Sequence, residues 1–307
     1  MADVAHDAGV STATVSRVLR GEQGVSSPAT RERVLASAAE LGYIVNSVAS
    51  SMRSQRTGTV GLVIADVANP WFGQLVGGVE SVLSPAGLSV ILANTSNSDE
   101  RERAAVQTLL EKQVDALVVA SSCADGVHLR EAVARGTFVV LVDADLPDLD
   151  VDSVTIDNVA AARTAVDHLL DFGHHDVAIV MGGAGPASDR ARLEGYRQAL
   201  AARNLHVPHE FVCSGADTFE GGRAAAASVL EQWRRPSAFF ATNNFMTMGT
   251  LVAIAEAGVK VPDDVSVVGI DDMEWYPIAD PPITAVHESA AQMGQVAAER
   301  LLLRLRR

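Results

Sequence analysis

The sequence predicts an all-α N-terminal head followed by an α/β body of two lobes, each a doubly wound parallel sheet, with a ligand cleft between them. Three observations predict this class. The chain has 307 residues, enough for two domains and a small appendage. Apolar residues recur at helical steps up to Leu41 and then, from Thr59, in short runs rich in Val and Ile that alternate with helical patterns. Ten such runs are more than one sheet holds comfortably, so two parallel sheets are expected.

Composition excludes several classes of protein. Apolar residues make up 48% of the chain and charged residues 20%, which is typical of a globular protein and not of a disordered one. No apolar run approaches the ~18–20 residues of a membrane span, and the N-terminus does not resemble a secretory signal. Cys123 and Cys213 form neither a disulfide framework nor a paired metal-ligand spacing. We therefore expect a cytoplasmic protein with no membrane partner.

The charge is unevenly distributed. The net charge is −14, yet residues 1–57 carry six arginines against five acidic residues, so the excess of negative charge lies in the body. A relatively basic head on an acidic body is expected where only the head contacts a polyanion.

Local signals place three short helices in the head. Gly9 and Ser11 separate the first two, and a segment rich in Gly and Ser separates the second from the third. Ser27 is expected to cap the third helix, with Pro28 in its first turn and Gly42 at its C-terminal end.

The first two helices fit a helix-turn-helix. Ala5 is small enough for a close helix crossing, Gly9 tolerates the turn, and Val15 and Val18 supply the buried face of the second helix. The residues left on the exposed side are Thr12, Ala13, Ser16 and Arg17.

This exposed side suits DNA. Arg17 can place a bidentate fork on guanine, while Ser11, Thr14 and Ser16 are short donors suited to phosphates. The alternative is that the three amphipathic helices form a dimerisation or docking module.

The body alternates strands and helices. The runs predicted as strands are 60–65, 88–93, 116–120, 138–142, 154–156, 177–181, 211–213, 238–241, 265–270 and 283–286. The helical patterns between them include 101–111, 160–170, 190–203, 222–233 and 248–256. We expect the chain to pass between the lobes near Val154–Asp157 and again near Thr284–His287.

A resemblance covers nearly the whole chain. The segment Asp3–Leu19 resembles the opening of the lactose-repressor/galactose-repressor (LacI/GalR) family of bacterial transcription regulators. Further matches follow in the family's order at Thr30–Val34, Glu40–Tyr43, Asn46–Ala49, Gly61–Val63, Asn69–Phe72, Glu111–Leu117, Arg192–Tyr196, Asn243–Met246, Val261–Asp272 and Pro282–Val286. The resemblance implies a periplasmic-binding-protein-like body behind the helix-turn-helix head.

We accordingly expect a head over 1–43, a hinge helix or linker over 44–57, and an effector-binding and dimerisation domain over 58–307. Within that domain the N-lobe takes about 58–156 with 288–307, and the C-lobe about 157–287. Relative to the family, the chain begins three or four residues late and ends at Arg307 before a final strand region, which leaves a sheet position in the second lobe unfilled.

The resemblance also implies DNA contacts beyond the second helix. Family hinge helices order on operator DNA, and Met52 stands where an apolar residue leans into a central minor-groove step. Arg20, Asn46 and Ala49 complete the DNA-binding set. The alternative for this serine-rich stretch is a flexible linker when free, which becomes a helix when bound.

For the effector, the resemblance places contacts at Trp71, Phe72, Asp143, Arg192, Asn243 and Asp271. Carboxylates, an amide and a guanidinium pair with vicinal hydroxyls, while an aromatic face packs on C–H surface, so a sugar is expected. The alternative for any one of them is a helix cap or an inter-lobe salt bridge. Asp217 replaces an aromatic residue that the family usually has, and Phe219 is the expected substitute.

Other chemistries lack their signals. The glycine-rich 181–188 lacks the spacing of a dinucleotide site. His174 and His175 with Asp176, and His206 with His209, offer no third ligand at a helical spacing. No nucleophile elbow, P-loop or pair of catalytic carboxylates stands out. We expect no enzyme activity, no cofactor and no metal.

Together these observations predict an effector-controlled transcription regulator, a repressor acting as a homodimer on a pseudo-palindromic operator, with Trp71–Leu83 as the expected dimer stretch. The alternative is a sugar-binding protein or sugar-processing enzyme without a DNA role. Retardation of a DNA band, relieved by a sugar, would separate the two.

Overall fold

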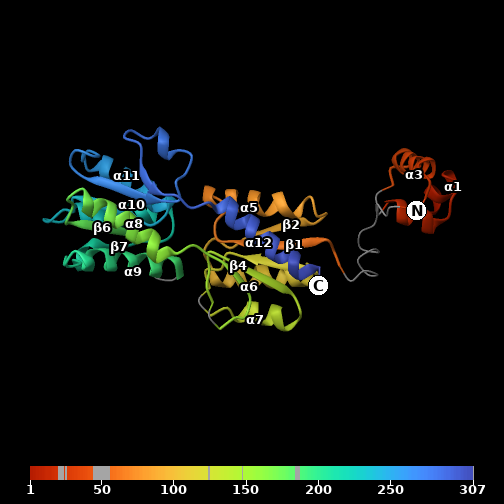
Figure 1. Ribbon diagram of the computed structural model, residues 1–307, viewed down its shortest axis with the longest axis horizontal. Helices are drawn as coiled ribbons and strands as arrows, with labels where there is room; N and C mark the ends of the chain where they lie inside the picture. Colours follow the sequence, from red (N-terminus) through yellow and green to blue (C-terminus); the bar gives the residue numbers. More distant parts are fainter. Residues whose placement is uncertain are drawn as a thin grey trace. The chain divides into compact units, whose positions relative to one another are not determined.

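The structure is a computed structural model that describes residues 1–19, 24, 26–43, 56–123, 125–146, 148–183 and 187–306. The chain divides into two compact units, Met1–Thr57 and Gly58–Arg307, which are described separately (Figure 1).

The first unit holds three helices, α1 (Ala2–Asp7), α2 (Thr12–Leu19) and α3 (Pro28–Glu40). The local predictions for this unit are confirmed. Gly9 and Gly42 have φ of 64° and 58°, in the left-handed region that glycine tolerates. The Ser27 hydroxyl caps α3 by accepting from the Thr30 amide at 3.2 Å, and Pro28 occupies its first turn. A small core forms where the three helices meet; its most buried residues are Val4, Val15, Val18 and Val34.

The second unit contains two sheets of five parallel strands each. The first has the order β2-β1-β3-β4-β5 and the second β10-β9-β8-β6-β7. In chain order the strands are β1 (Thr59–Ile64), β2 (Ser89–Asn94), β3 (Ala116–Val119), β4 (Phe138–Val142), β5 (Asp152–Val154), β6 (Val177–Met181), β7 (Val212–Ser214), β8 (Ala238–Ala241), β9 (Ser266–Ile270) and β10 (Thr284–Val286). The predicted class of two parallel-sheet lobes is confirmed.

One strand lies two residues earlier than the run that predicted it. The run 154–156 is apolar, but β5 pairs with β4 from Asp152, opposite Val140, to Val154, opposite Val142. Because β5 is the edge of its sheet, backbone pairing defines it, and its side chains need not be apolar. The Ser153 hydroxyl donates to the Ala144 carbonyl at 2.7 Å, which holds the edge in place.

Helices cover both faces of each sheet, as the alternating pattern predicts. They are α5 (Pro70–Leu83), α6 (Asp99–Glu111), α7 (Val127–Ala134), α8 (Asn158–Asp171), α9 (Ala187–Ala202), α10 (Phe219–Leu230), α11 (Asn244–Glu256) and α12 (Ala290–Leu305). None of the described helices is long and apolar enough to cross a membrane.

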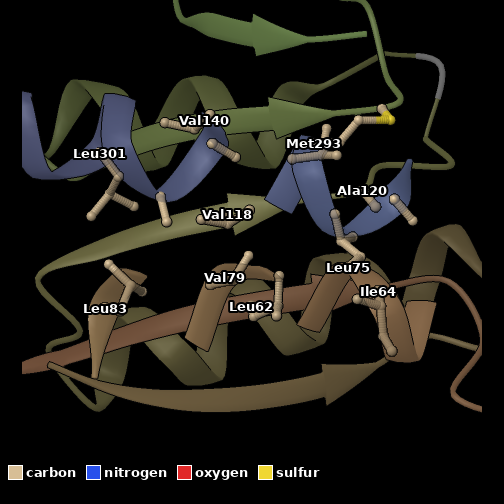
Figure 2. Packing of buried hydrophobic residues seen from close by; sticks show 14 of the residues in the cluster. Leu62, Ile64, Leu75, Val79, Leu83, Val118, Ala120, Val140, Met293 and Leu301 are labelled. Atoms are coloured by element: carbon tan, nitrogen blue, oxygen red, sulfur yellow. The ribbon is translucent and has the colours of Figure 1, made fainter. Parts of the chain in front are cut away.

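In the first lobe, α5 and α12 cover one face of the sheet, and α6 and α7 cover the other. Strand residues alternate between the two faces: Leu62 and Val118 pack under α5 and α12, whereas Val63 and Leu117 face α6 and α7. Figure 2 shows the first of these clusters, with Leu75 of α5 and Met293 of α12 beside Val118.

The chain passes between the lobes twice. After β5 in the first sheet it enters α8 of the second lobe, and after β10 in the second sheet it returns as α12. The connections therefore lie at 155–157 and 287–289, close to the predicted positions. Glu288 belongs to the second connection and lies between the two lobes.

The contact between α5 and α12 depends on glycine. A Cβ at Gly78 would lie 2.0 Å from the Ala291 carbonyl oxygen, and one at Gly294 would lie 2.3 Å from that of Leu75. The apolar face of α5 is therefore occupied within the chain, including Leu75 and Leu83. The face of α5 left to solvent includes Gly73, Gly77 and Glu80.

This packing generates a test. Gly78→Ala forces the backbones of α5 and α12 apart, so it should lower the free energy of unfolding by about 1–3 kcal/mol, the usual cost of overpacking. Its neighbour Gly77 has open space around an added Cβ. Gly77→Ala should therefore raise stability by about 0.5–1 kcal/mol through helix propensity. Urea unfolding of both variants at one protein concentration checks this, and equal effects would contradict it.

Candidate functional site

A cavity of about 80 Å³, open to solvent, lies between the two lobes of the second unit. The sequence proposed six effector contacts, and all six line this cavity: Trp71, Phe72, Asp143, Arg192, Asn243 and Asp271. They come from both lobes. Three of them follow the C-terminal ends of parallel strands, since Asp143 comes after β4, Asn243 after β8 and Asp271 after β9.

Arg192, on the first turns of α9, is the hub of the polar wall. It is 4% exposed, and its guanidinium donates to Asn158 Oδ1 at 2.7 Å and to the Thr242 carbonyl at 2.5 Å. A third contact reaches Glu288 Oε2 at 3.4 Å. Burial disfavours the charged form, but the carboxylates, led by Glu288 and Asp143, outweigh it and raise the pKa of Arg192. The guanidinium therefore stays charged.

Glu288 extends this wall to the first lobe. Its Oε1 accepts a hydrogen bond from Trp71 Nε1 at 2.7 Å, and it is 6% exposed. The tryptophan of α5, the glutamate of the returning connection and the arginine of α9 thus form one continuous chain of polar contacts between the lobes. A buried ion pair broken by removing one partner costs several kcal/mol, so this chain is a strong constraint on the two lobes.

Two aspartates lie in backbone conformations that only a few residue types tolerate. Asp143 has a φ of 49° and Asp271 a φ of 88°, directly after their strands. Asp271 Oδ2 accepts from the Asn244 amide at 2.6 Å. Asp143 Oδ1 is buried and has no hydrogen-bond donor among the described residues. Such backbone strain is concentrated at functional sites, and it holds both carboxyls at the edge of the cavity.

Burial changes the acidity of this wall. It raises the pKa of Asp143 to about 7 against the opposing charge of Arg192, and that of Asp189 to about 6. The pKa of Asp271 rises well above its usual range through burial and the nearby Glu288. Burial also raises the pKa of Asp217, whose Oδ1 accepts from Asn243 Nδ2 at 2.8 Å. The cavity is acidic and partly protonated near neutral pH.

The aromatic side of the cavity comes from the start of α5. Asn69 caps this helix by accepting from the Trp71 amide at 3.0 Å, with Pro70 in the first turn. The Trp71 and Phe72 rings meet edge to face at 5.0 Å. Trp71 is nearly buried and engaged with Glu288, so the half-buried Phe72 offers the more accessible ring.

A buried carboxylate behind the cavity holds one of its loops. Glu102 of α6 is fully buried and accepts from the Ser121 hydroxyl at 2.5 Å, the Ser122 amide at 2.9 Å and His128 Nε2 at 2.9 Å. Burial would raise the pKa of Glu102, but these hydrogen bonds outweigh it and lower the pKa. Ser121 and Ser122 line the cavity, so Glu102 sets the position of this part of its wall.

The same region holds the one group of described residues with metal-ligand geometry. Ligand atoms of Glu102, Cys123 and His128 lie within 4.8 Å of one another, all buried. Both oxygens of Glu102 already accept hydrogen bonds, and burial with the nearby Glu102 raises the pKa of the Cys123 thiol. The arrangement is that of a structural clamp on the 121–123 loop. The histidine pair singled out in the sequence has another role, since both ring nitrogens of His174 contact serines, at Ser237 and Ser266.

The first unit presents the predicted DNA face. Thr12, Ala13 and Arg17 are exposed on α2, and Ser16 is half-buried. The Ser11 hydroxyl accepts from the Thr14 amide at 3.1 Å, so this pair caps the N-terminus of α2. The other predicted DNA contacts, at Arg20, Asn46, Ala49 and Met52, lie outside the described residues.

Two family models match the chain, one for each unit. Residues 1–46 match the model of bacterial regulatory proteins of the lacI family, and residues 57–305 match that of periplasmic binding proteins and the sugar binding domain of the LacI family. The chain is 34% identical over 309 residues to the ribose operon repressor of Escherichia coli (strain K12), covering 99% of this chain and 92% of that protein. The chain belongs to the LacI family of bacterial transcription regulators.

Solved structures of LacI-family members agree with this assignment. The cellobiose complex of the regulator CelR matches with a TM-score of 0.76 and 32% identity, over 99% of this chain and 92% of that one. The lac repressor dimer bound to operator and the anti-inducer ONPF matches with a TM-score of 0.85 and 29% identity, over the same shares. This LacI-family chain is thus a DNA-binding transcription regulator controlled by a small-molecule effector, and not an enzyme.

Three residues of the cavity's hydrogen-bond network were not predicted from the sequence. Asp189, Asn158 and Glu288 take part in its hydrogen bonds but were not proposed. Glu288 had a signal, because it follows a predicted strand and precedes a helix, the position where α/β sheets bind ligands. The expected substitution by Phe219 was wrong: Phe219 begins α10 and does not line the cavity, whereas Asp217 does. The alternative of helix caps and salt bridges also holds in part, since Asn243 caps α11.

The raised acidity of Asp143 generates a prediction. The folded protein keeps this proton to about pH 7, whereas the unfolded chain loses it near pH 4, so unfolding free energy should fall as the pH rises from about 4 to 7. Asp143→Asn removes this titration. The free energy of unfolding of the variant, relative to that of the wild type, should therefore increase as the pH rises from 4 to 8.

Urea unfolding over this pH range measures the effect. Asp263→Asn, at an exposed turn residue of the second lobe, is the control and should follow the wild-type profile. An Asp143→Asn profile parallel to the wild type would show that Asp143 is ionised throughout.

Proposed function

We propose that this chain is a repressor that binds a pseudo-palindromic operator as a homodimer in the cytoplasm and responds to a sugar bound between its lobes. The observation that carries the proposal is the convergence of all six expected effector residues on one cavity of a chain that also has a helix-turn-helix head. Trp71, Phe72, Asp143, Arg192, Asn243 and Asp271 are the proposed effector contacts.

DNA recognition is assigned to the exposed side of α2 and to the segment that follows the head. Arg17 reads a guanine, Thr12 and Ala13 contact base edges directly beneath them, and Ser11, Thr14 and Ser16 contact phosphates. Arg20 contacts the sugar-phosphate backbone of the DNA. Residues 44–57 form the hinge, where Asn46 and Ala49 contact DNA and Met52 enters the minor groove.

A sugar suits the chemistry of the cavity. Hydroxyl groups donate to carboxylates such as those of Asp143 and Asp271, and Phe72 offers a ring on which the C–H face of a pyranose or furanose packs. The names of two similar proteins agree with this class, since one is a ribose operon repressor and the other is a regulator in complex with cellobiose.

Effector and operator are coupled through lobe closure. Contacts already span the lobes beside the cavity: Gln74 Nε2 donates to Glu274 Oε1 at 2.8 Å and Asn97 Nδ2 to the Asp217 carbonyl at 3.4 Å. A ligand that binds the closed lobes more tightly shifts the balance toward them. In a dimer this shift changes the separation of the two hinges and heads, and so the fit to two half-sites.

The DNA assignment is tested by Arg17→Ala. Loss of one bidentate base contact should weaken operator binding by about 1–3 kcal/mol and leave binding to random DNA nearly unchanged. Arg33→Ala, which removes another exposed arginine, on α3, is the control and should weaken both kinds of binding alike. The readout is a retardation assay at fixed salt with and without a panel of sugars.

Equal losses for Arg17→Ala on operator and random DNA would assign Arg17 to phosphates. Wild-type operator binding that no sugar alters would contradict the sugar effector.

The homodimer is assigned to the exposed face of α5. The expected stretch Trp71–Leu83 has its large apolar side chains inside the chain, so the face available to a partner centres on Gly73, Val76 and Gly77. Because an added side chain at Gly77 meets nothing within this chain, Gly77→Arg should fold normally. It should shift the protein from dimer to monomer in sedimentation and weaken operator binding.

Ala201→Arg, on the exposed side of α9 in the other lobe, is the control and should remain a dimer. A Gly77→Arg protein that sediments as a dimer would place the interface elsewhere.

A further inference from the structure

The effector cavity has more carboxyl groups than its cations can pair with. Five carboxyl groups line it, and among its described lining residues Arg192 is the only cation. The acidic groups come from both lobes: Asp143 after β4, Asp189 on α9, Asp217 before α10, Asp271 after β9 and Glu288 before α12, with Asp66 near Asp217.

The single cation does not offset this surplus. Arg192 pairs with Glu288, and its other hydrogen bonds go to the neutral Asn158 side chain and the Thr242 carbonyl. It is therefore held by the lobes themselves and neutralises one carboxylate.

The remaining aspartates have only neutral partners or none. The Asp217 carboxyl accepts from the side-chain Nδ2 of Asn243, and the Asp189 carboxyl accepts from the Thr242 hydroxyl at 3.1 Å. Asp143 Oδ1, buried beside the cavity, meets no donor among the described residues. Burial raises the pKa of Asp143 and of Asp189, and the nearby Asp217 raises both pKa values further while Arg192 opposes the change. A ligand that displaces water from these three carboxyls must supply donors, and preferably positive charge, because buried carboxylates without a counter-ion are costly.

We propose that the effector is a polyhydroxylated amine of the amino-sugar class, whose ammonium group binds among the carboxylates of Asp143, Asp189 and Asp217. This proposal rests on the assignment of the cavity as the effector site. The hydroxyl groups of the ligand are bound by the rest of the acidic wall, and its C–H face packs on Phe72. The same surplus of carboxylates rejects anions such as sugar phosphates.

A neutral sugar would leave a different signature. Its hydroxyl groups can donate to a carboxylate and accept from a protonated carboxyl, so its affinity should change little between pH 5.5 and pH 7.0. An ammonium group favours the ionised carboxylates instead, so affinity for an amine should rise from pH 5.5 to pH 7.0 while the amine stays protonated.

The experiment is calorimetric titration of the full chain with matched pairs at both pH values: glucosamine with glucose, galactosamine with galactose, and mannosamine with mannose. At least one amine should bind about tenfold more tightly than its parent sugar, and its N-acetyl derivative should lose that advantage with the charge. Asp217→Asn should lower the preference for that amine about tenfold, whereas Asp263→Asn, at an exposed turn residue outside the cavity, should retain it.

The outcomes separate this inference from the proposed function. A neutral sugar that binds at least as tightly as its amine at pH 7.0 overturns the amino-sugar class and leaves the sugar-responsive repressor standing. A chain that binds none of the six compounds overturns the amino-sugar class and also counts against a sugar effector, while the retardation assay still reports on operator binding independently.

Discussion

The buried pair of Arg192 and Glu288 is the constraint on which the rest of the effector-binding unit depends. Both side chains are nearly buried, so neither charge can be left without a partner and the two must stay together. Arg192 belongs to a helix of the second lobe, whereas Glu288 lies on the connection that returns to the first and accepts from Trp71 of α5. One electrostatic requirement therefore holds both lobes and the aromatic end of the cavity in a single arrangement.

That arrangement places the cavity at the C-terminal ends of both sheets. Parallel strands deliver their following residues to one edge, so Asp143 and Asp271 reach the cavity from different lobes although more than a hundred residues separate them. Both have left-handed backbone conformations directly after their strands, and both side chains line the cavity. The returning helix α12 then closes the first lobe, and it can do so only because Gly78 and Gly294 allow the α5 and α12 backbones to approach.

The acidity of the cavity follows from the same burial. A wall built to hold a buried guanidinium needs carboxylates nearby, yet this chain supplies more than Arg192 can neutralise. The surplus is held partly as protons, with the pKa of Asp143 raised to about 7 by burial. The lobes are thus joined by charges, and the cavity between them presents acceptors and exchangeable protons. The contact between the lobes and the protonation of the cavity are therefore linked in one site.

Much of this protein follows from local sequence. Periodicity and turn residues determined the three head helices, the ten parallel strands and the positions where the chain crosses between lobes, because apolar spacing and capping act over a few residues. Family motifs added the six cavity residues. Only the tertiary structure decided that Glu288 and Asp189 also line the cavity, and that Asp217 lines it whereas Phe219 does not. It also decided that the apolar face of α5 packs against α12. These depend on contacts between residues far apart in the chain. The burial and the neighbouring charges that shift the pKa values of the cavity exist only once both lobes have packed.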